Sequence, residues 1–361
     1  MLIAISAAET SGDLIGSKLV AALKAQDANA QIEGLAGEKM VAAGCVQLWD
    51  QKRVNVMGFS EVLTKLLSLL RLRKTIIQTF SKNKPDVFIG VDAPDFNFVI
   101  EKKLKQQGVK TVHFISPSVW AWRAGRVKKI KKSTDLVLCL FPFEVDFYEK
   151  HGQRAVFVGH PLAETLHPRE NYQSTKNILL MPGSRESEVK RLLPELLASA
   201  QLMAKQDSQL NFHIALANDE LLEWAKSLAD KANISLSVGD AHQRAAQADL
   251  VLVASGTAAL ELALIGVPMV VVYKLSAVSY FIASKLVKTK NVSLPNIIAN
   301  KTLVPELIQA EANADNIAKH ALQILSSDTE RLTQEFTKIH QQLSLNASAE
   351  SARIIKEFAN E

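Results

Sequence analysis

Short apolar runs alternate with amphipathic stretches along the first half of the chain. The apolar runs lie at residues 2–6, 87–91, 111–115, 136–140 and 155–159. Runs of this length that end in glycine, proline or polar residues are typical of strands buried on both faces of a sheet. Between them, apolar residues recur at spacings of three and four, which indicates helices. The alternation predicts an α/β fold with a parallel sheet, whose strands all end at one edge.

The pattern lapses between residues 160 and 175, where Pro161, Pro168 and Asn171 gather. Irregular stretches of this composition often separate domains, so we place a domain boundary here. A second α/β series follows, with strands expected at residues 177–181, 210–217, 234–238 and 249–254. From Leu303 onward the chain is expected to be helical.

The predicted organisation is therefore two α/β domains and a final helix. Residues 1–163 form the first domain, residues 164–340 the second, and residues 341–361 a helix that packs back across the hinge. The length of 361 residues independently favours two domains, because it exceeds what one hydrophobic core usually accommodates.

The net charge indicates an anionic partner. Formal net charge is +5 and the pI is about 9.0, which suits nucleic acid, phospholipid or a nucleotide-sugar. Aromatic residues make up only 6% and no RNA-stacking motif is present, so we expect no nucleic-acid partner. Basic residues crowd one short stretch: Arg123, Arg126, Lys128, Lys129, Lys131 and Lys132.

Cysteine and histidine usage bears on the cellular compartment and on whether a metal site is expected. Cys45 and Cys139 are far apart, so no disulfide is expected and a reducing cytosol is indicated. The eight histidines lack metal-ligand spacing, so we expect no metal. The apolar N-terminus lacks a basic flank and is soon followed by Glu9 and Asp13, which favours a first strand over a secretory signal.

The stretch from Ser60 to Gln78 is predicted to be a helix with a wide apolar face. Its apolar positions are Val62, Leu63, Leu66, Leu67, Leu69, Leu70, Ile76 and Ile77. Charged residues such as Lys65 and Arg73 interrupt the run, which argues against a transmembrane span. Two interpretations stay open: a helix buried between the sheet and a neighbour, or an amphipathic helix whose surplus leucines enter a membrane interface.

A carboxylate follows the most apolar strand of the first half. The strand 87–91 stops at Asp92, and Pro94 is expected to hold Ala93 extended. Open α/β sheets bind ligands beyond the carboxyl ends of their strands. Asp92 is therefore either a functional carboxylate or only the cap of a turn. The next helix is expected from Val99 to Gln107.

Two further loops of the first half carry candidate chemistry. Residues 7–13 form a small-residue turn before a helix, which Thr10 or Ser11 can cap. Trp120, Trp122 and Arg123 follow another strand end. The tryptophans either pack beneath their loop or form the wall of a sugar or acyl site, with Arg123 ready to meet a phosphate.

The second half contains two small-residue turns that suit a diphosphate. Gly183 and Ser184 let the backbone approach, and Arg185 supplies a forked cation. Ser255, Gly256 and Thr257 stand between a strand and a helix, where free backbone N–H groups favour anions. Glu261, one turn inside that helix, is either a ribose ligand or a solvated helix residue.

The order of these motifs resembles the lipid-A-disaccharide synthases, inverting glycosyltransferases of family 19 with the GT-B architecture of two Rossmann-like domains facing each other across a cleft. The matching stretches are ETSGD at 9–13, VDAPDFN at 91–97, SPSVWAWR at 116–123, GH at 159–160, PGSR at 182–185, SGTAALE at 255–261 and SLPN at 293–296. They span nearly the whole chain. Ala8 and Thr10 depart from the family, which usually has Gly and Ala there.

The resemblance implies a reaction and a set of roles. UDP-2,3-diacylglucosamine would donate its sugar to 2,3-diacylglucosamine 1-phosphate (lipid X), giving the β-1,6 disaccharide 1-phosphate and UDP. Asp92 would be the general base, with Asp95 and Glu9 as the alternatives for this role. The acceptor or lipid side would comprise Glu9, Ser11, Asp13, Asp95, Trp120, Trp122 and Arg123. The UDP-sugar would be held by Gly183, Ser184, Arg185, Ser255, Gly256, Thr257, Glu261 and Asn296, without a metal or other cofactor.

Acyl-bearing substrates imply a membrane partner. The enzyme would lie in the cytoplasm, peripheral on the cytoplasmic face of the inner membrane, and contact its anionic surface through Val62, Leu66, Leu67, Leu69 and Leu70. Monomer and homodimer both stay open. Two alternatives remain: another GT-B enzyme that uses UDP-N-acetylglucosamine, such as a cell-wall transferase or an epimerase, and a non-catalytic nucleotide-binding protein at the membrane surface.

Overall fold

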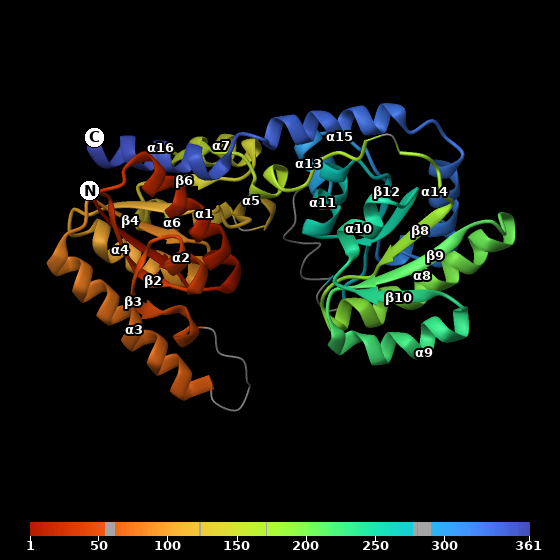
Figure 1. Cartoon of the computed structure of the whole chain (residues 1–361), viewed down its shortest axis with the longest axis horizontal. Helices are drawn as coiled ribbons and strands as arrows, with labels where there is room; N and C mark the ends of the chain where they lie inside the picture. The colour runs from red at the N-terminus through yellow and green to blue at the C-terminus, as the bar shows by residue number, and fades with distance from the viewer. Residues whose placement is uncertain (55–61, 123, 171, 277–279, 281–289) are drawn as a thin grey trace. The chain divides into compact units, whose positions relative to one another are not determined.

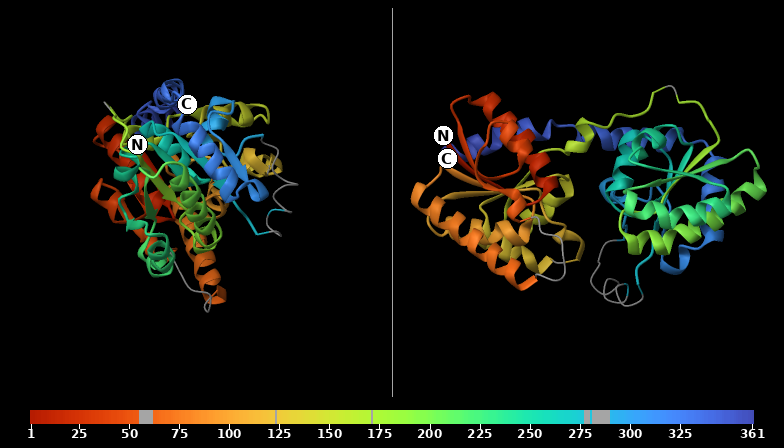
Figure 2. Two further views of the ribbon diagram at one scale, coloured as in Figure 1. Left: turned by 90° about the vertical axis from the view of Figure 1, so that its right-hand side faces the viewer. Right: turned by 60° about the horizontal axis from the view of Figure 1, so that its bottom comes forward.

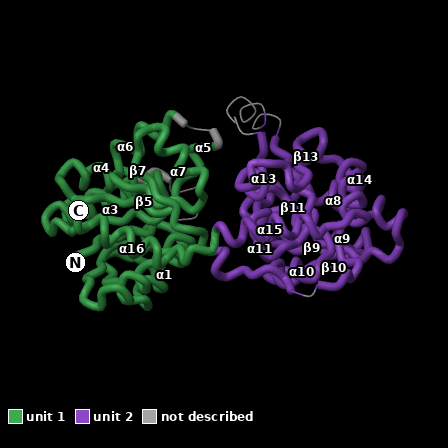
Figure 3. Tube along the Cα trace, turned by 90° about the horizontal axis from the view of Figure 1, so that it is seen from above, with its two compact units in different colours: residues 1–161, 343–361 green, residues 162–342 purple. Residues whose placement is uncertain are grey.

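The chain forms two compact units (Figure 3). The computed structural model describes residues 1–54, 62–122, 124–170, 172–276, 280 and 290–361. Unit 1 is Met1–Pro161 with Leu343–Glu361, and unit 2 is Leu162–Gln342. Each unit is a parallel sheet with helices packed against it, so the predicted α/β class with two Rossmann-like domains is confirmed.

Unit 1 is built on a seven-stranded parallel sheet in the order β3-β2-β1-β4-β5-β6-β7 (Figure 1). Its strands are β1 (Leu2–Ala7), β2 (Gln31–Ala36), β3 (Val46–Asp50), β4 (Val87–Val91), β5 (Lys110–Phe114), β6 (Leu136–Cys139) and β7 (Arg154–Phe157). Because β4 pairs with both β1 and β5, the carboxyl ends of these three strands are neighbours.

Alternate residues of β4 point to opposite faces of the sheet, and each face is covered by its own set of helices. Val87, Ile89 and Val91 pack with α1 (Thr10–Gln26), α2 (Glu38–Ala42) and α16 (Ala347–Asn360). Phe88 points the other way, toward α3 (Val62–Asn83) and α4 (Pro94–Lys105). The same face continues over β6 with α6 (Val127–Ser133) and α7 (Pro142–Glu149), and the short α5 (Val119–Trp122) precedes α6.

Unit 2 has a six-stranded parallel sheet in the order β10-β9-β8-β11-β12-β13. Figure 2 shows this sheet with helices packed against it. Its strands are β8 (Asn177–Met181), β9 (Asn211–Leu216), β10 (Ser235–Val238), β11 (Leu250–Ala254), β12 (Met269–Tyr273) and β13 (Glu306–Ile308). Its helices are α8 (Glu186–Gln206), α9 (Leu222–Ala232), α10 (Ala241–Ala246), α11 (Thr257–Ile265), α13 (Leu294–Ala299), α14 (Ala314–Leu325) and α15 (Glu330–Leu343). Helices α8, α9 and α14 share one apolar core with the sheet, and the buried residues of α11 lie outside it.

Several local expectations were wrong. Ala93 is not extended but left-handed (φ 42°, ψ 59°), and α4 begins at Pro94 instead of Val99. The carbonyl of Ala93 already accepts from Phe96 and Asn97, so the helix starts directly at the proline, whose fixed φ suits a first helical position. Helix α1 is preceded by Glu9, so Thr10 and Ser11 lie inside it and do not cap it.

The C-terminal region is not wholly helical. Residues Glu306–Ile308 form β13, which pairs with β12 at the edge of the second sheet. A strand of three residues is too short to carry an alternation that can be distinguished from the surrounding helical pattern. No helix among the described residues has the length and apolarity that a membrane crossing requires.

Candidate active site

The loop after β4 turns sharply at Asp92 and Ala93. The Asp92 N–H donates to the Phe114 carbonyl at 2.9 Å, which continues the pairing with β5. Both Asp92 and Ala93 then adopt positive φ (50° and 42°). Left-handed conformations cost non-glycine residues of order 1 kcal/mol or more each and persist where surrounding contacts impose them. The half-buried Asp92 is thus fixed at the carboxyl edge of the sheet.

Asn97 supplies the contacts that impose this turn. Its side chain is fully buried. The amide nitrogen lies 2.8 Å from the Asp92 carbonyl, 3.1 Å from that of Val91 and 3.2 Å from that of Ser6, and the Ser6 hydroxyl donates to the amide oxygen at 2.7 Å. One side chain therefore joins the ends of β1 and β4 and holds the peptide of Asp92.

Glu9 is the second carboxylate at this edge. It follows β1, whose last residue Ala7 pairs with Val91. Partial burial raises the pKa of Glu9, and the negative charge of Asp92 raises it further. A carboxylate whose pKa is raised can divide the roles of proton donor and acceptor with a second carboxylate beside it.

A cavity of about 610 Å³ is lined by Glu9 and by Ala93, the residue after Asp92. Helix α4, helix α1 and helix α3 all contribute to it. Its lining residues are Ala8, Glu9, Thr10, Ser11, Val54, Leu69, Arg73, Ala93, Pro94, Asp95 and Phe96. The fold thus gathers Glu9, Ser11 and Asp95 from the predicted acceptor side with Leu69 from the predicted membrane helix.

Arg73 is a lining residue to which the sequence assigned no role. Its guanidinium carbon lies 5.3 Å from the centroid of the Phe96 ring. Within the described part of the chain, its buried Nε has no hydrogen-bond partner. Burial lowers the pKa of the guanidinium and the charge of Asp95 counteracts this. A cation with a free donor suits an oxygen-rich anionic ligand. In the sequence Arg73 was visible only as an interruption of an apolar run.

Other residues of the predicted acceptor side are not gathered at this cavity. Asp13 is buried, and its carboxylate accepts from the backbone N–H groups of Gly37, Lys39 and Met40 at 2.9–3.1 Å, which caps α2. Trp120 packs edge-on against Phe143, with centroids 4.7 Å apart.

Several predicted side chains cannot be placed. Arg123 lies outside the described residues. So do the side chains of Trp122, Val62 and Leu66, whose backbone belongs to described helices.

In unit 2, the two small-residue turns follow neighbouring strands, since β8 pairs with β11. Gly183 has φ 114°, and a Cβ there would approach the Glu188 carboxylate to 2.9 Å. Arg185 is largely exposed and pairs with Glu188 at 2.8 Å. An exposed pair of this kind contributes little to stability, so its guanidinium can exchange partner. Ser184 belongs to the same turn.

The second turn places Ser255 and Gly256 before α11, which begins at Thr257. The space beside Gly256 is open, so a ligand can approach the backbone there. Within the same helix, Glu261 is bound to the His242 ring nitrogen at 2.8 Å and is neither fully solvated nor fully buried.

Asn296 has a different environment. It is fully buried, donates to the Val304 carbonyl and Glu306 carboxylate, and accepts from the N–H groups of Leu303 and Val304. Its own hydrogen-bonding positions are therefore filled, and it shapes the loop around residues 293–304. A direct contact with the donor stays a prediction.

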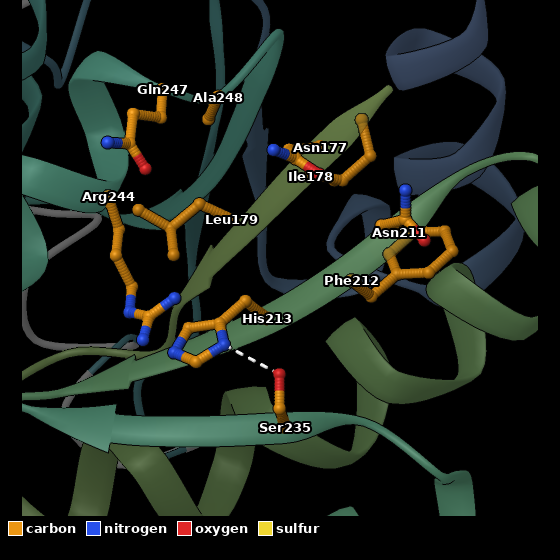
Figure 4. Close-up of a pocket in the computed structure, with 10 residues that line it drawn as sticks. All are labelled: Asn177, Ile178, Leu179, Asn211, Phe212, His213, Ser235, Arg244, Gln247 and Ala248. Carbon is orange, nitrogen blue, oxygen red and sulfur yellow. Dashed lines mark hydrogen bonds between the residues drawn. The ribbon is translucent and has the colours of Figure 1, made fainter. Parts of the chain in front are cut away.

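A cavity of about 170 Å³ lies elsewhere on unit 2 (Figure 4). Asn177, Asn211 and Ser235 line it, and they are the first residues of β8, β9 and β10. His213 bonds to Ser235 at 2.7 Å within it. Because the strands are parallel, this cavity is at the opposite end from the Ser184 and Ser255 turns, and we assign it no role in catalysis.

Comparison with known proteins defines the context of this site. The family model described as lipid-A-disaccharide synthetase matches residues 3–358. The lipid-A-disaccharide synthase of Glaesserella parasuis serovar 5 is 42% identical over 379 residues, covering 99% of this chain and 98% of the relative. That of Psychromonas ingrahamii is also 42% identical, over 372 residues, with the same coverage of both chains.

Solved structures with little sequence identity share the fold. A UDP-GlcNAc 2-epimerase from Neisseria meningitidis bound to UDP-GlcNAc superposes with TM-score 0.62 at 11% identity, over 99% of this chain and 98% of that one. A spinosyn rhamnosyltransferase complexed with thymidine diphosphate gives 0.57 at 13% identity, over 98% and 99%. These likenesses support the GT-B architecture. With a family match over nearly its whole length, the chain belongs to the lipid-A-disaccharide synthase family.

Proposed function

We propose that the protein transfers 2,3-diacylglucosamine from UDP to the 6-hydroxyl of lipid X, giving the β-1,6 disaccharide 1-phosphate and UDP. The observation that carries this proposal is the position of Asp92. It is held by Asn97 at the carboxyl edge of the first sheet, beside Glu9 and next to residues that line a cavity with both polar and apolar walls. Family membership supplies the substrates as candidates.

In the proposed step, the acceptor hydroxyl attacks the anomeric carbon of the donor sugar. The new bond joins the acceptor oxygen to that carbon, the bond from that carbon to the diphosphate oxygen breaks, and the hydroxyl proton passes to Asp92. Attack opposite the leaving group inverts the anomeric configuration. Glu9, whose pKa is raised, is suited to hold a proton near Asp92 and so keep the total negative charge of the pair low.

The departing UDP gains negative charge, which the protein must stabilise. We assign this to Arg185, whose guanidinium is exposed, and to the N-terminus of α11 at Thr257, where the space beside Gly256 is open. Glu261, bound to His242, is suited to accept from ribose hydroxyls. Catalysis without a metal ion stays part of the proposal.

Acyl-chain substrates require contact with a bilayer. We propose that the protein works on the cytoplasmic face of the inner membrane, and that α3 makes the contact. Leu67 and Leu70 on α3 are about half exposed (54% and 47%), and Leu69 of the same helix lines the cavity. Exposed leucines that adjoin a substrate cavity suit extraction of a lipid from a membrane interface.

The test is an assay of purified protein in detergent micelles with UDP-2,3-diacylglucosamine and lipid X. Release of UDP with stoichiometric disaccharide supports the proposal, and absence of product rejects it.

The Asp92→Asn variant should keep UDP affinity and lose a factor of roughly 10²–10⁴ in kcat. Turnover near that of the unmodified enzyme would remove Asp92 from the role of base. Consumption of UDP-N-acetylglucosamine without lipid X would instead indicate the epimerase alternative.

A further inference from the structure

A second cavity of unit 1, of about 580 Å³, lies between α4 and α6. Its apolar part is formed by Phe98 and Val99 of α4, by Val119, and by Ile130 of α6. Val119 and Ile130 are buried, whereas Val99 is 42% exposed. The groove therefore has an apolar floor that is open to solvent, which we call the α4–α6 groove.

The rim of the α4–α6 groove is cationic. It carries Lys102 and Lys103 from α4 and Arg126, Lys129 and Lys132 from or next to α6, against the single carboxylate of Asp95 at one end. None of these five cations is in an ion pair with another of the residues that the structure describes.

Lys105, a neighbouring lysine of α4, differs from the rim cations because it is ion-paired. It pairs with Asp135 at 3.0 Å and donates to the carbonyls of Lys131 and Thr134, which ties α4 to α6. The five rim cations form no such ion pair with the residues that the structure describes. Like charges held together without counter-charges destabilise a protein surface unless an anion is bound there.

An apolar floor with a cationic rim selects a class of ligand. Phosphate headgroups satisfy the rim and an acyl chain satisfies the floor. Nucleic acid fits less well, because its bases stack on exposed aromatic rings and only Phe98 of the lining is aromatic.

The acceptor's own phosphate is the competing ligand. The near end of the groove, at Pro94 and Asp95, is shared with the first cavity. Lys102 follows Pro94 by eight residues, which is about 12 Å along the helix, so a lipid other than the reacting one suits this far end.

The position of the groove agrees with a bilayer ligand. Helix α3 packs on α4 and α4 on α6, so the three form one layer over the same face of the sheet. The exposed Leu67 and Leu70 of α3 belong to this layer. An anionic membrane surface that takes up these leucines therefore meets the layer that contains the cationic rim.

We propose that the α4–α6 groove binds an anionic phospholipid of the membrane, with its headgroup on the rim and part of an acyl chain on the floor. The inference rests on the proposed function for its membrane setting. It adds a site for a lipid other than the reacting substrates, and this lipid orients unit 1 on the bilayer.

The test is flotation of the full-length protein with vesicles, without substrates. Vesicles of phosphatidylcholine alone are compared with vesicles that also contain phosphatidylglycerol. The double variant Lys102→Glu/Lys129→Glu should bind the anionic vesicles roughly tenfold or more weakly. The matched control is Lys226→Glu/Lys231→Glu on α9 of unit 2, which makes the same charge change on exposed lysines and should bind as the unmodified protein does.

A second variant separates the groove from general charge attraction. Val99→Asn should weaken binding to anionic vesicles even at high salt. Val46→Asn, at a valine on β3 that is more exposed than Val99 (58% against 42%), should not. Unchanged binding of the Lys102→Glu/Lys129→Glu variant, or equal losses in both control and test variants, would overturn the proposal.

Activity in detergent micelles then distinguishes this inference from the proposed function. The groove variants should retain disaccharide formation there, because no bilayer is needed. Loss of micellar activity together with vesicle binding would place the groove in the reaction itself and overturn the assignment to a bilayer lipid.

Discussion

At the scale of single residues, the unusual feature is that a small buried amide controls the geometry of a charged group. Asp92 and Ala93 both occupy left-handed backbone conformations. Neither has the freedom of glycine, so the turn persists only while Asn97 bonds the Asp92 carbonyl and the ends of β1 and β4. The carboxylate position is then a property of the core behind it.

Replacing Asn97 by alanine should reveal this control. We expect kcat to fall roughly 10–100-fold, because small displacements of a catalytic group have large effects on rate, with little change in the affinity for UDP. Ser6→Ala is the control, since it removes only the hydroxyl that donates to the Asn97 oxygen. Steady-state kinetics are measured below the unfolding temperature of each variant. If Asn97→Ala lost stability but kept kcat, its role would be confined to folding.

Glu144 offers a pH-dependent test of a buried acid. Burial raises the pKa of its carboxyl to about 7, although the Phe141 N–H donates to it at 3.2 Å. Between the unfolded value of 4.5 and about 7, the folded state retains a proton that the unfolded state has released. The free energy of unfolding therefore decreases as pH rises through this window and levels off above it.

The Glu144→Gln variant should lack this dependence. Relative to the variant, the unmodified protein should lose about 1.4 kcal/mol of unfolding free energy per pH unit across the window. Urea unfolding at a series of pH values measures it. If the unfolding free energy of the two proteins changed with pH in parallel, Glu144 would be ionised in the folded state across this pH window.

At the scale of elements, α3 has two kinds of leucine. Leu67 and Leu70 are about half exposed, whereas Leu72 is 8% exposed and packs with Phe80 and Phe88. The buried-helix interpretation therefore holds for Leu72, which packs in the core. Contact of the exposed Leu67 and Leu70 with a membrane interface stays a prediction.

Serine substitutions should separate the two stripes. Leu67→Ser/Leu70→Ser should change the free energy of unfolding by less than about 1 kcal/mol and release the protein from vesicles. Leu72→Ser should instead destabilise unit 1 by roughly 2–5 kcal/mol. Vesicle flotation and thermal unfolding measure the two effects. Strong destabilisation by the first pair would mean that those leucines are structural.

The elements were predictable where a local pattern defines them. Strand β4 coincides with the expected residues 87–91, because an apolar run between Asp86 and Asp92 leaves little alternative. The start of α4 was missed because Pro94 favours both a strand end and a first helical turn.

The site was predictable only in part. The strand-end rule pointed to Asp92 as a candidate, but Asn97 and Arg73 were not assigned roles. The bond from Ser6 to Asn97 joins residues 91 positions apart, and the burial of Arg73 against Phe96 depends on how α3 packs on α4. Such contacts depend on tertiary pairing that no local pattern contains.

At the scale of the whole molecule, the chain begins and ends in unit 1. Helix α16 packs against α1, and Ile355 and Phe358 share the core of β1 and β4. Arg154 also binds the last residue, Glu361, through two short contacts. Unit 1 therefore cannot complete its core until residues far apart in the sequence meet, whereas unit 2 is one continuous segment.

This arrangement predicts that a change in the last helix weakens the first unit alone. Ile355 is fully buried, so Ile355→Ala should lower the stability of unit 1 by about 2–5 kcal/mol. Hydrogen exchange followed by mass spectrometry should show faster exchange in β1 and β4, with β8 and β11 unchanged. Arg353→Ala is the control, because Arg353 only pairs with Glu350 and Glu357 on the same helix surface, and such pairs contribute a few tenths of a kcal/mol each. Equal acceleration in both sheets would instead show that the two units unfold as one cooperative body, and that the C-terminal helix stabilises the molecule as a whole.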